Sequence, residues 1–198
     1  MRKGSKCCLL TIGCLFIIFF SVTYLLAPQK PWDQVQITLP VDDFTNFVIF
    51  QGYGKTEWNE FHNGLDFCFN SSVEILSPCD GYIIGIELKY NEDGGHWQTN
   101  LNIMMNLLWS AEIVFESIVK TETLGKKQFD SIKVKWGQRV SAGDLLGILL
   151  FEGEIPHIHF SLNYGNNRVC PYQYFTDSAQ NQLDAQLKGI NFTDPVCN

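Results

Sequence analysis

Short runs rich in β-branched and apolar residues, separated by turn-forming residues, are the feature that most restricts the fold of this chain. Short strands with frequent turns are typical of antiparallel sandwiches and barrels. The sequence therefore predicts an all-β domain, an antiparallel β-sandwich or a barrel-like fold. The runs lie at residues 73–76, 82–86, 101–105, 112–115, 131–135, 145–151 and 158–162.

The C-terminal residues carry a different pattern. Asp177 can cap a short helix that extends through Lys188, and Leu183 and Leu187 share one face of it. We expect three segments in the chain. These are a membrane anchor or signal peptide with the start of a linker at residues 1–30, a β-domain at 31–175, and a C-terminal helix with a cysteine-linked tail at 176–198.

The composition is that of a folded, acidic domain. Of the 198 residues, 45% are hydrophobic and 14% are aromatic, which is enough to form a core and argues against disorder. The net charge is −7, and residues 31–198 are more negative still, because the first thirty residues carry four basic side chains and no acidic one. An anionic surface repels phosphate backbones, so we expect no nucleic-acid partner.

The N-terminal segment is predicted to be a transmembrane helix. Arg2, Lys3 and Lys6 precede an uncharged run from Cys7 to Ala27, which is 21 residues long. About 20 apolar residues span a bilayer, and the basic flank predicts an inside N-terminus. The chain would then be a single-pass membrane protein with an extracytoplasmic C-terminal domain. The alternative is a signal peptide whose cleavage gives a secreted product, although its apolar segment would normally be shorter.

Four cysteines follow the apolar run, namely Cys68, Cys79, Cys170 and Cys197. An even number in an oxidising compartment predicts disulfide bonds, and four cysteines allow three pairings. We expect the pairing that closes short loops, Cys68–Cys79 with Cys170–Cys197. No two of them have the C-x2-C spacing of a structural zinc site, which disfavours a thiolate cluster.

Two short motifs carry histidines and an aspartate at even spacing. His62 and Asp66 are four residues apart, and His157 and His159 are two apart. In extended chain, residues separated by an even number point to the same face, so each pair should converge. If the two strands lie side by side, their side chains gather in one patch. Three such ligands with an open fourth position are the coordination of a catalytic zinc ion.

The surrounding sequence contains four motifs in a fixed order. They are FHNGLDF at 61–67, LSPCDGYII at 76–84, VKWGQRVSAGDLLG at 134–147 and PHIHF at 156–160. This order and spacing resembles the lysostaphin-type (LytM-like) zinc metallopeptidases, a family of peptidoglycan endopeptidases. The resemblance covers about residues 45–175. It implies a predominantly antiparallel β fold with a groove, in which the metal lies on the floor of the sheet and loops form the walls.

The resemblance also implies roles for individual residues. The zinc ligands, for one ion per chain, would be His62, Asp66 and His159. His157 stands where the family has a catalytic histidine. The neutral imidazoles and the carboxylate would hold the ion, and His157 would accept a proton or stabilise the developing oxyanion.

One position departs from the family pattern. A further catalytic histidine is expected on the strand before the glycine-rich segment, and the residue nearest that position is Glu116. Its carboxylate is either a general base or a bystander that pairs with a surface cation. His96 follows Gly94 and Gly95, and we expect it to be an exposed loop histidine.

Two function classes follow from these observations. The first is a membrane-anchored zinc metalloendopeptidase, a hydrolase that cleaves peptide bonds in cell-wall-type cross-links, with a peptide or peptidoglycan-like polymer as substrate. The second is a non-catalytic family member whose groove binds a wall peptide, a glycan or a protein partner. The intact ligand motifs favour the enzyme, and the missing histidine favours the binding protein.

Overall fold

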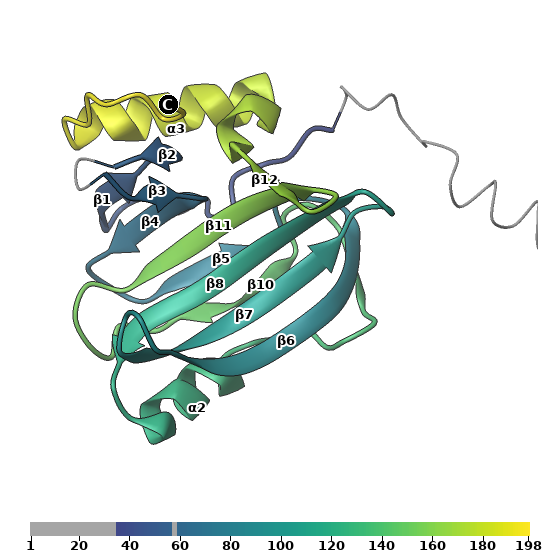
Figure 1. The fold of residues 1–198 in the computed structure, drawn as a ribbon, viewed down its shortest axis with the longest axis vertical. Coiled ribbons are helices and arrows are strands. Elements are labelled where there is room, and N and C mark those ends of the chain that lie inside the picture. Colours follow the sequence, from purple (N-terminus) through teal and green to yellow (C-terminus); the bar gives the residue numbers. More distant parts are fainter. Residues whose placement is uncertain (1–34, 57–58) are drawn as a thin grey trace, which may run out of the picture. The chain divides into compact units, whose positions relative to one another are not determined.

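The computed structural model describes residues 35–56 and 59–198, and the compact unit Gln36–Asn198 contains the fold (Figure 1). The predicted anchor at residues 1–30 lies outside the described residues. Within the described ranges, none of the helices has the length and apolar character needed to cross a membrane.

One antiparallel sheet of eight strands forms the body of the domain. Its strand order is β1-β4-β11-β8-β7-β6-β9, and β12 pairs with β11 outside this path. The strands are β1 (Phe47–Gln51), β4 (Leu65–Phe69), β6 (Gly81–Asn91), β7 (His96–Met104), β8 (Trp109–Val119), β9 (Arg139–Val140), β11 (His157–Tyr164) and β12 (Asn167–Val169). Figure 1 shows the sheet curling around the molecule. The predicted β class is confirmed, but the main sheet is a half-barrel rather than half of a sandwich or a closed barrel.

Two smaller strand pairs complete the β structure. They are β5 (Val73–Leu76) with β10 (Leu145–Leu149), and β2 (Gly54–Lys55) with β3 (Phe61–His62). Six of the seven runs predicted from sequence overlap β5, β6, β7, β8, β10 and β11. The β10 strand lies against β8, so the short pair covers part of the large sheet.

Alternation along the central strands separates an apolar face from a polar face. The large apolar side chains that are fully buried on β8 and β11 are Ile113, Phe115, Ile158, Phe160 and Leu162. Because successive residues of a strand point to opposite faces, Glu116, His157 and His159 lie on the other side of the sheet. A slip of one residue would bury these polar groups and expose side chains that each contribute about 1.5–3 kcal/mol by burial. The core therefore fixes the register that positions the site.

Helix α3 (Asp177–Gly189) confirms the predicted C-terminal helix. The N-cap is Thr176 rather than Asp177, because the Thr176 side chain accepts a hydrogen bond from the Ala179 backbone N–H. Asp177 lies in the first turn, where its charge favours the positive end of the helix dipole. Leu183 is fully buried, as the pattern predicts. A short 3-10 helix, η2 (Pro171–Tyr174), precedes α3.

The sequence predicts a strand at residues 131–135, and this prediction is wrong. The segment follows a second helix, α2 (Glu122–Asp130), and Ser131 is its C-cap. The Ser131 hydroxyl contacts the backbone carbonyls of Gln128 and Ile148, and Lys133 N donates to Leu146 O, so the segment is joined to β10 by isolated contacts rather than by a strand ladder. Gly125 makes the helix hard to recognise from sequence. It packs so tightly that a Cβ there would lie 2.6 Å from Trp97 Cβ.

The C-terminal tail is joined to the domain by a disulfide bond between Cys170 and Cys197, as predicted. Backbone hydrogen bonds run from Tyr53 N to Val196 O (2.8 Å) and from Asn198 N to Tyr53 O (3.0 Å). The tail therefore holds the segment that enters the β2–β3 hairpin, and this hairpin carries His62.

The predicted Cys68–Cys79 bond is absent, because both residues are free thiols. Cys68 lies on β4 in the large sheet, whereas Cys79 follows β5, which belongs to the two-stranded sheet. Closeness in sequence therefore does not bring the two thiols together. Burial raises the pKa of each thiol to about 12, which disfavours the reactive thiolate.

Replacing Cys170 with serine should lower the free energy of unfolding by about 2–4 kcal/mol, because the disulfide restricts the unfolded chain. Urea unfolding of the full chain in detergent, followed by tryptophan fluorescence, measures this difference. Reductant should destabilise the wild type by a similar amount and leave the variant unchanged. Equal stability of the two proteins without reductant would contradict the prediction.

Candidate metal centre

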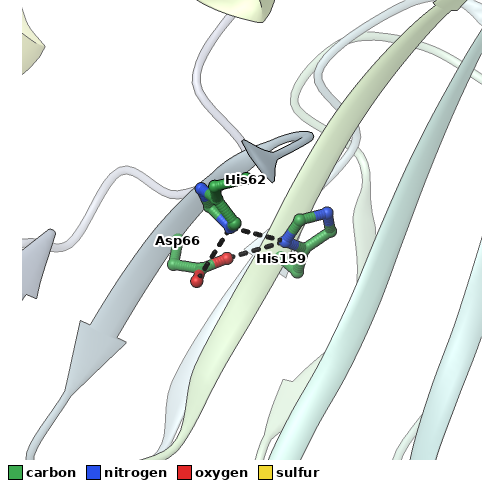
Figure 2. Close-up of side chains that lie close together, drawn as sticks. All are labelled: His62, Asp66 and His159. Atoms are coloured by element: carbon green, nitrogen blue, oxygen red, sulfur yellow. Dashed lines mark hydrogen bonds and ion pairs between the residues drawn. The ribbon is translucent and has the colours of Figure 1, made fainter. Parts of the chain in front are cut away.

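Three of the predicted site residues converge on one point above the β4–β11 pair (Figure 2). Asp66 and His159 are register partners, and His159 Nδ1 lies 2.8 Å from Asp66 Oδ1. His62 ends β3, and its Nε2 lies 3.1 Å from Asp66 Oδ2 and 3.1 Å from His159 Nδ1. The three ligand atoms all lie within 4.8 Å of one another. Across residues 35–56 and 59–198, this is the one group of His, Cys, Asp or Glu side chains placed to hold a metal ion.

The second nitrogen of each imidazole is held by an acceptor. His62 Nδ1 donates to the carbonyl of Gly52 at 2.7 Å. His159 Nε2 lies 2.9 Å from Ser161 Oγ and 3.1 Å from Asn63 Oδ1. A proton on each outer nitrogen leaves the lone pair of the inner nitrogen free for a metal. Two imidazoles and one carboxylate, with room for a fourth ligand, fit Zn²⁺.

The cluster is partly open to solvent and strongly polarised. The side chains of His62, Asp66 and His159 are 13%, 12% and 15% exposed, so a small ion or substrate group can reach them. Burial opposes the charge on Asp66, but hydrogen bonds from His159 and His62 outweigh it and lower the pKa of that carboxyl well below its usual range. Burial likewise lowers the pKa of His62, and the Asp66 carboxylate more than reverses this effect. Asp66 is therefore an anion that holds both imidazoles.

Gly64 leaves the space that the His159 ring occupies. A Cβ at this position would lie 2.5 Å from His159 Nε2 and 2.8 Å from Phe160 O. The Gly64→Ala variant should therefore push the ring away from Asp66 and weaken zinc affinity by about 10–100-fold, as is typical when the support of a metal ligand is lost. Competition with a chromophoric chelator measures the affinity. In Gly189→Ala nothing lies within 4 Å of the added Cβ, so this control should bind zinc like the wild type. Unchanged affinity in Gly64→Ala would contradict the described packing.

Glu116 and His157 form a second pair on the same face. They are register partners across β8 and β11, and Glu116 Oε2 lies 3.5 Å from His157 Nε2. Their side chains are 13% and 19% exposed. His157 is two residues before His159 on β11, so this pair lies next to the metal cluster along the strand. The structure thus brings both predicted catalytic residues together.

His96 is not the exposed loop residue that the sequence predicts. It is the first residue of β7, it is 5% exposed, and its Nε2 donates to Glu116 Oε2 at 2.8 Å. The hydrogen bond to Glu116 is the main reason why the pKa of His96 is raised. The turn formed by residues 92–95 ends at Gly95, so His96 already belongs to β7, and its contact with Glu116 places its side chain on the polar face of the sheet.

Sequence reasoning also missed the groups that orient the imidazoles. Ser161 lies two residues after His159, so the same even spacing that pairs the histidines could have identified it. Asn63 lies inside the first motif, where no periodic signal distinguishes it. The carbonyl of Gly52 carries no side-chain signal at all.

Comparisons with known proteins identify the fold. No protein-family model matches the chain, and no curated protein matches it by sequence. Helicobacter pylori Csd3 matches in structure with a TM-score of 0.51 and 16% identity, covering 79% of this chain and 41% of that one. The catalytic domain of the prophage-encoded M23 protein EnpA from Enterococcus faecalis, crystallised as a point mutant, matches with a TM-score of 0.49 and 20% identity. This match covers 67% of this chain and 95% of that one. A zinc containing peptidase from Vibrio cholerae matches with a TM-score of 0.48 and 21% identity, covering 69% of this chain and 39% of that one.

These likenesses concern the fold. The chain spans only 39% of the Vibrio protein and 41% of Csd3, and the identities are low throughout. The three residues that the sequence resemblance implies as metal ligands, His62, Asp66 and His159, do lie together in the structure. The described domain therefore shares the fold of Csd3, and its predominantly antiparallel β architecture is the one that the resemblance to the lysostaphin-type peptidases implies.

Proposed function

We propose that this chain is a zinc-dependent peptidase with His62, Asp66 and His159 as its metal ligands. The convergence of these three side chains carries the proposal, because each imidazole directs one nitrogen to the cluster and has an acceptor for the other. A second pair, Glu116 and His157, lies beside them on the same face and can act on protons. Zinc is supported by the donor set and by a structural neighbour described as a zinc containing peptidase.

The chemistry divides between the metal and the two neighbouring side chains. Bound Zn²⁺ would supply a Lewis acid that polarises the scissile carbonyl and acidifies water. Glu116 and His157 would accept the proton of the attacking water and return one to the leaving amine. Their 3.5 Å separation allows the two groups to act together on one proton. After the peptide bond breaks, the products are a carboxylate and an amine.

The substrate class is proposed from the resemblance. Lysostaphin-type enzymes act on the peptides of peptidoglycan, and a structural neighbour is described as an antimicrobial peptidase. We propose peptide cross-links of the cell-wall type as the substrate. The acidic composition, with a net charge of −7, supports the absence of a nucleic-acid partner.

The direct experiment incubates the zinc-loaded full chain with a panel of cross-linked and linear wall peptides. Mass spectrometry should reveal new amino and carboxyl termini at one type of bond, and a chelator should prevent them. If the zinc-loaded chain retains a peptide for hours without cleaving it, the domain is a binding protein and the peptidase proposal fails.

We also propose that residues 1–30 anchor the protein in a membrane and that the β-domain and its tail face outward. The uncharged run Cys7–Ala27 and its basic N-terminal flank support this topology. The full-length chain should resist carbonate extraction, and protease added to intact cells should digest residues after the anchor. A carbonate-soluble product that begins near Pro28 would show a cleaved, secreted protein instead.

A further inference from the structure

One oxygen of Glu116 is shared by two imidazoles that come from different strands. Glu116 Oε2 lies 2.8 Å from His96 Nε2 on β7 and 3.5 Å from His157 Nε2 on β11. Neither contact uses the other carboxylate oxygen. The three side chains therefore form a row across β7, β8 and β11, and the row ends at His157 beside the metal cluster.

Both ring nitrogens of His96 face acceptors. Nε2 faces the Glu116 carboxylate, and Nδ1 lies 3.2 Å from the carbonyl of Gly94. A neutral imidazole has one N–H and can satisfy only one of these acceptors, whereas an imidazolium satisfies both. The raised pKa of His96 agrees with this geometry. The two acceptors therefore favour an imidazolium at His96, and its partner is the carboxylate next to His157.

The backbone on both strands is irregular beside this contact. The β7–β8 register shifts between Trp97 and Thr99, directly after His96. On the opposite strand, Ile118 has a φ of 52°, a left-handed conformation that is costly for a β-branched residue. Bulges often redirect a side chain beside an active site. Here the irregularity lies where a His96 side chain meets a glutamate 20 residues away in sequence.

We propose that His96 is a positioning residue for the hydrolytic reaction: it holds Glu116 Oε2 within reach of His157. This inference rests on the proposed peptidase function. On the polar face, the resemblance predicts a histidine at the position of Glu116. In this chain a carboxylate occupies that position, and the imidazole comes from the neighbouring strand. His96 needs no contact with substrate or metal for this role.

Two substitutions at position 96 test the role. His96→Phe keeps a ring of similar size and removes both N–H groups, and it should reduce kcat by about 10²-fold, the cost of a misplaced catalytic group. KM and the content of one zinc per chain should stay unchanged. His96→Gln keeps one donor and should recover a large part of kcat.

A change that leaves His96 itself intact provides a second test. In Gly94→Ala the added Cβ would lie 2.5 Å from His96 Cε1, so the ring must move and kcat should fall. Gly95→Ala is the matched control in the same turn. It strains a residue with a φ of 66°, but nothing lies within 4 Å of its Cβ, so kcat should stay close to that of the wild type.

Nitrogen-15 NMR of the histidine side chains in the zinc-loaded wild type gives a readout that is independent of turnover. Both nitrogens of His96 should carry protons at pH 7, and Glu116→Gln should lower the pKa of this imidazole. Full kcat in His96→Phe, or loss of its zinc, would overturn the positioning role. If the wild type cleaves no substrate, the peptidase proposal fails. If the His96 imidazole is neutral at pH 7 and its pKa is unchanged in Glu116→Gln, the pairing of His96 with Glu116 is overturned, whatever the turnover.

Discussion

Asp66→Ala should remove zinc from the protein and abolish peptide hydrolysis. Asp66 supplies the only carboxylate of the cluster, and its two oxygens contact His159 Nδ1 and His62 Nε2. Without it, two of the three ligands that Figure 2 shows remain, which is too few for a stable zinc site. Elemental analysis after reconstitution and dialysis should find less than about a tenth of an equivalent of zinc in the variant.

The control for this experiment is Asp42→Ala, because Asp42 is exposed and far from the cluster in sequence. It should bind one equivalent of zinc and keep full turnover. If Asp66→Ala retained a full equivalent of zinc, the metal would have to bind at another site, and the assignment of the cluster as the zinc site would be wrong.

His157→Ala and Glu116→Gln should each keep zinc and lose about 10²- to 10⁴-fold in kcat, because a proton acceptor or oxyanion donor acts mainly in the transition state. Neither residue belongs to the cluster of three ligand atoms. Steady-state kinetics and elemental analysis on the same samples separate the two effects. If Glu116→Gln has full turnover, Glu116 is a bystander, and His157 must carry the proton transfer without it.

The polar half of the site could be predicted because it depends on strand alternation. The even spacing of His157 and His159 places both side chains on one face of β11. The antiparallel pairing of β4 with β11 then sets Asp66 opposite His159. His62 does not follow from this pairing, because it lies on β3 of the two-stranded β2–β3 sheet. The first motif is nevertheless not one strand, since β3 ends at His62 and β4 begins at Leu65.

The contact between His96 and Glu116 could not be predicted, because the sequence does not show which residues of β7 and β8 face each other across a register that shifts between Trp97 and Thr99. The glycines before His96 suggested a longer exposed loop, whereas the turn closes on Asn91, whose side chain accepts from Gly94 N.

The remaining errors have the same physical origin, namely tertiary contacts that outweigh local pattern. The residues at 131–135 resemble a strand in sequence, yet they follow directly after helix α2. The buried side chains of Gln128 and Ser131 contact the backbone carbonyl of Ile148 and hold the end of the helix there. Cys68 and Cys79 are close in sequence, yet they belong to segments of different sheets. The half-barrel shape and the separate β5–β10 pair depend on which distant strands pair, which periodicity does not encode.

Turnover measured while zinc is returned to the metal-free full chain tests the zinc-peptidase function most directly. Cleavage of a cross-linked wall peptide should rise in proportion to added zinc and reach its maximum at one equivalent per chain, while Asp66→Ala stays at background throughout. The zinc-peptidase function would be contradicted if the chain took up one equivalent of zinc through His62, Asp66 and His159 and still cleaved none of the peptides.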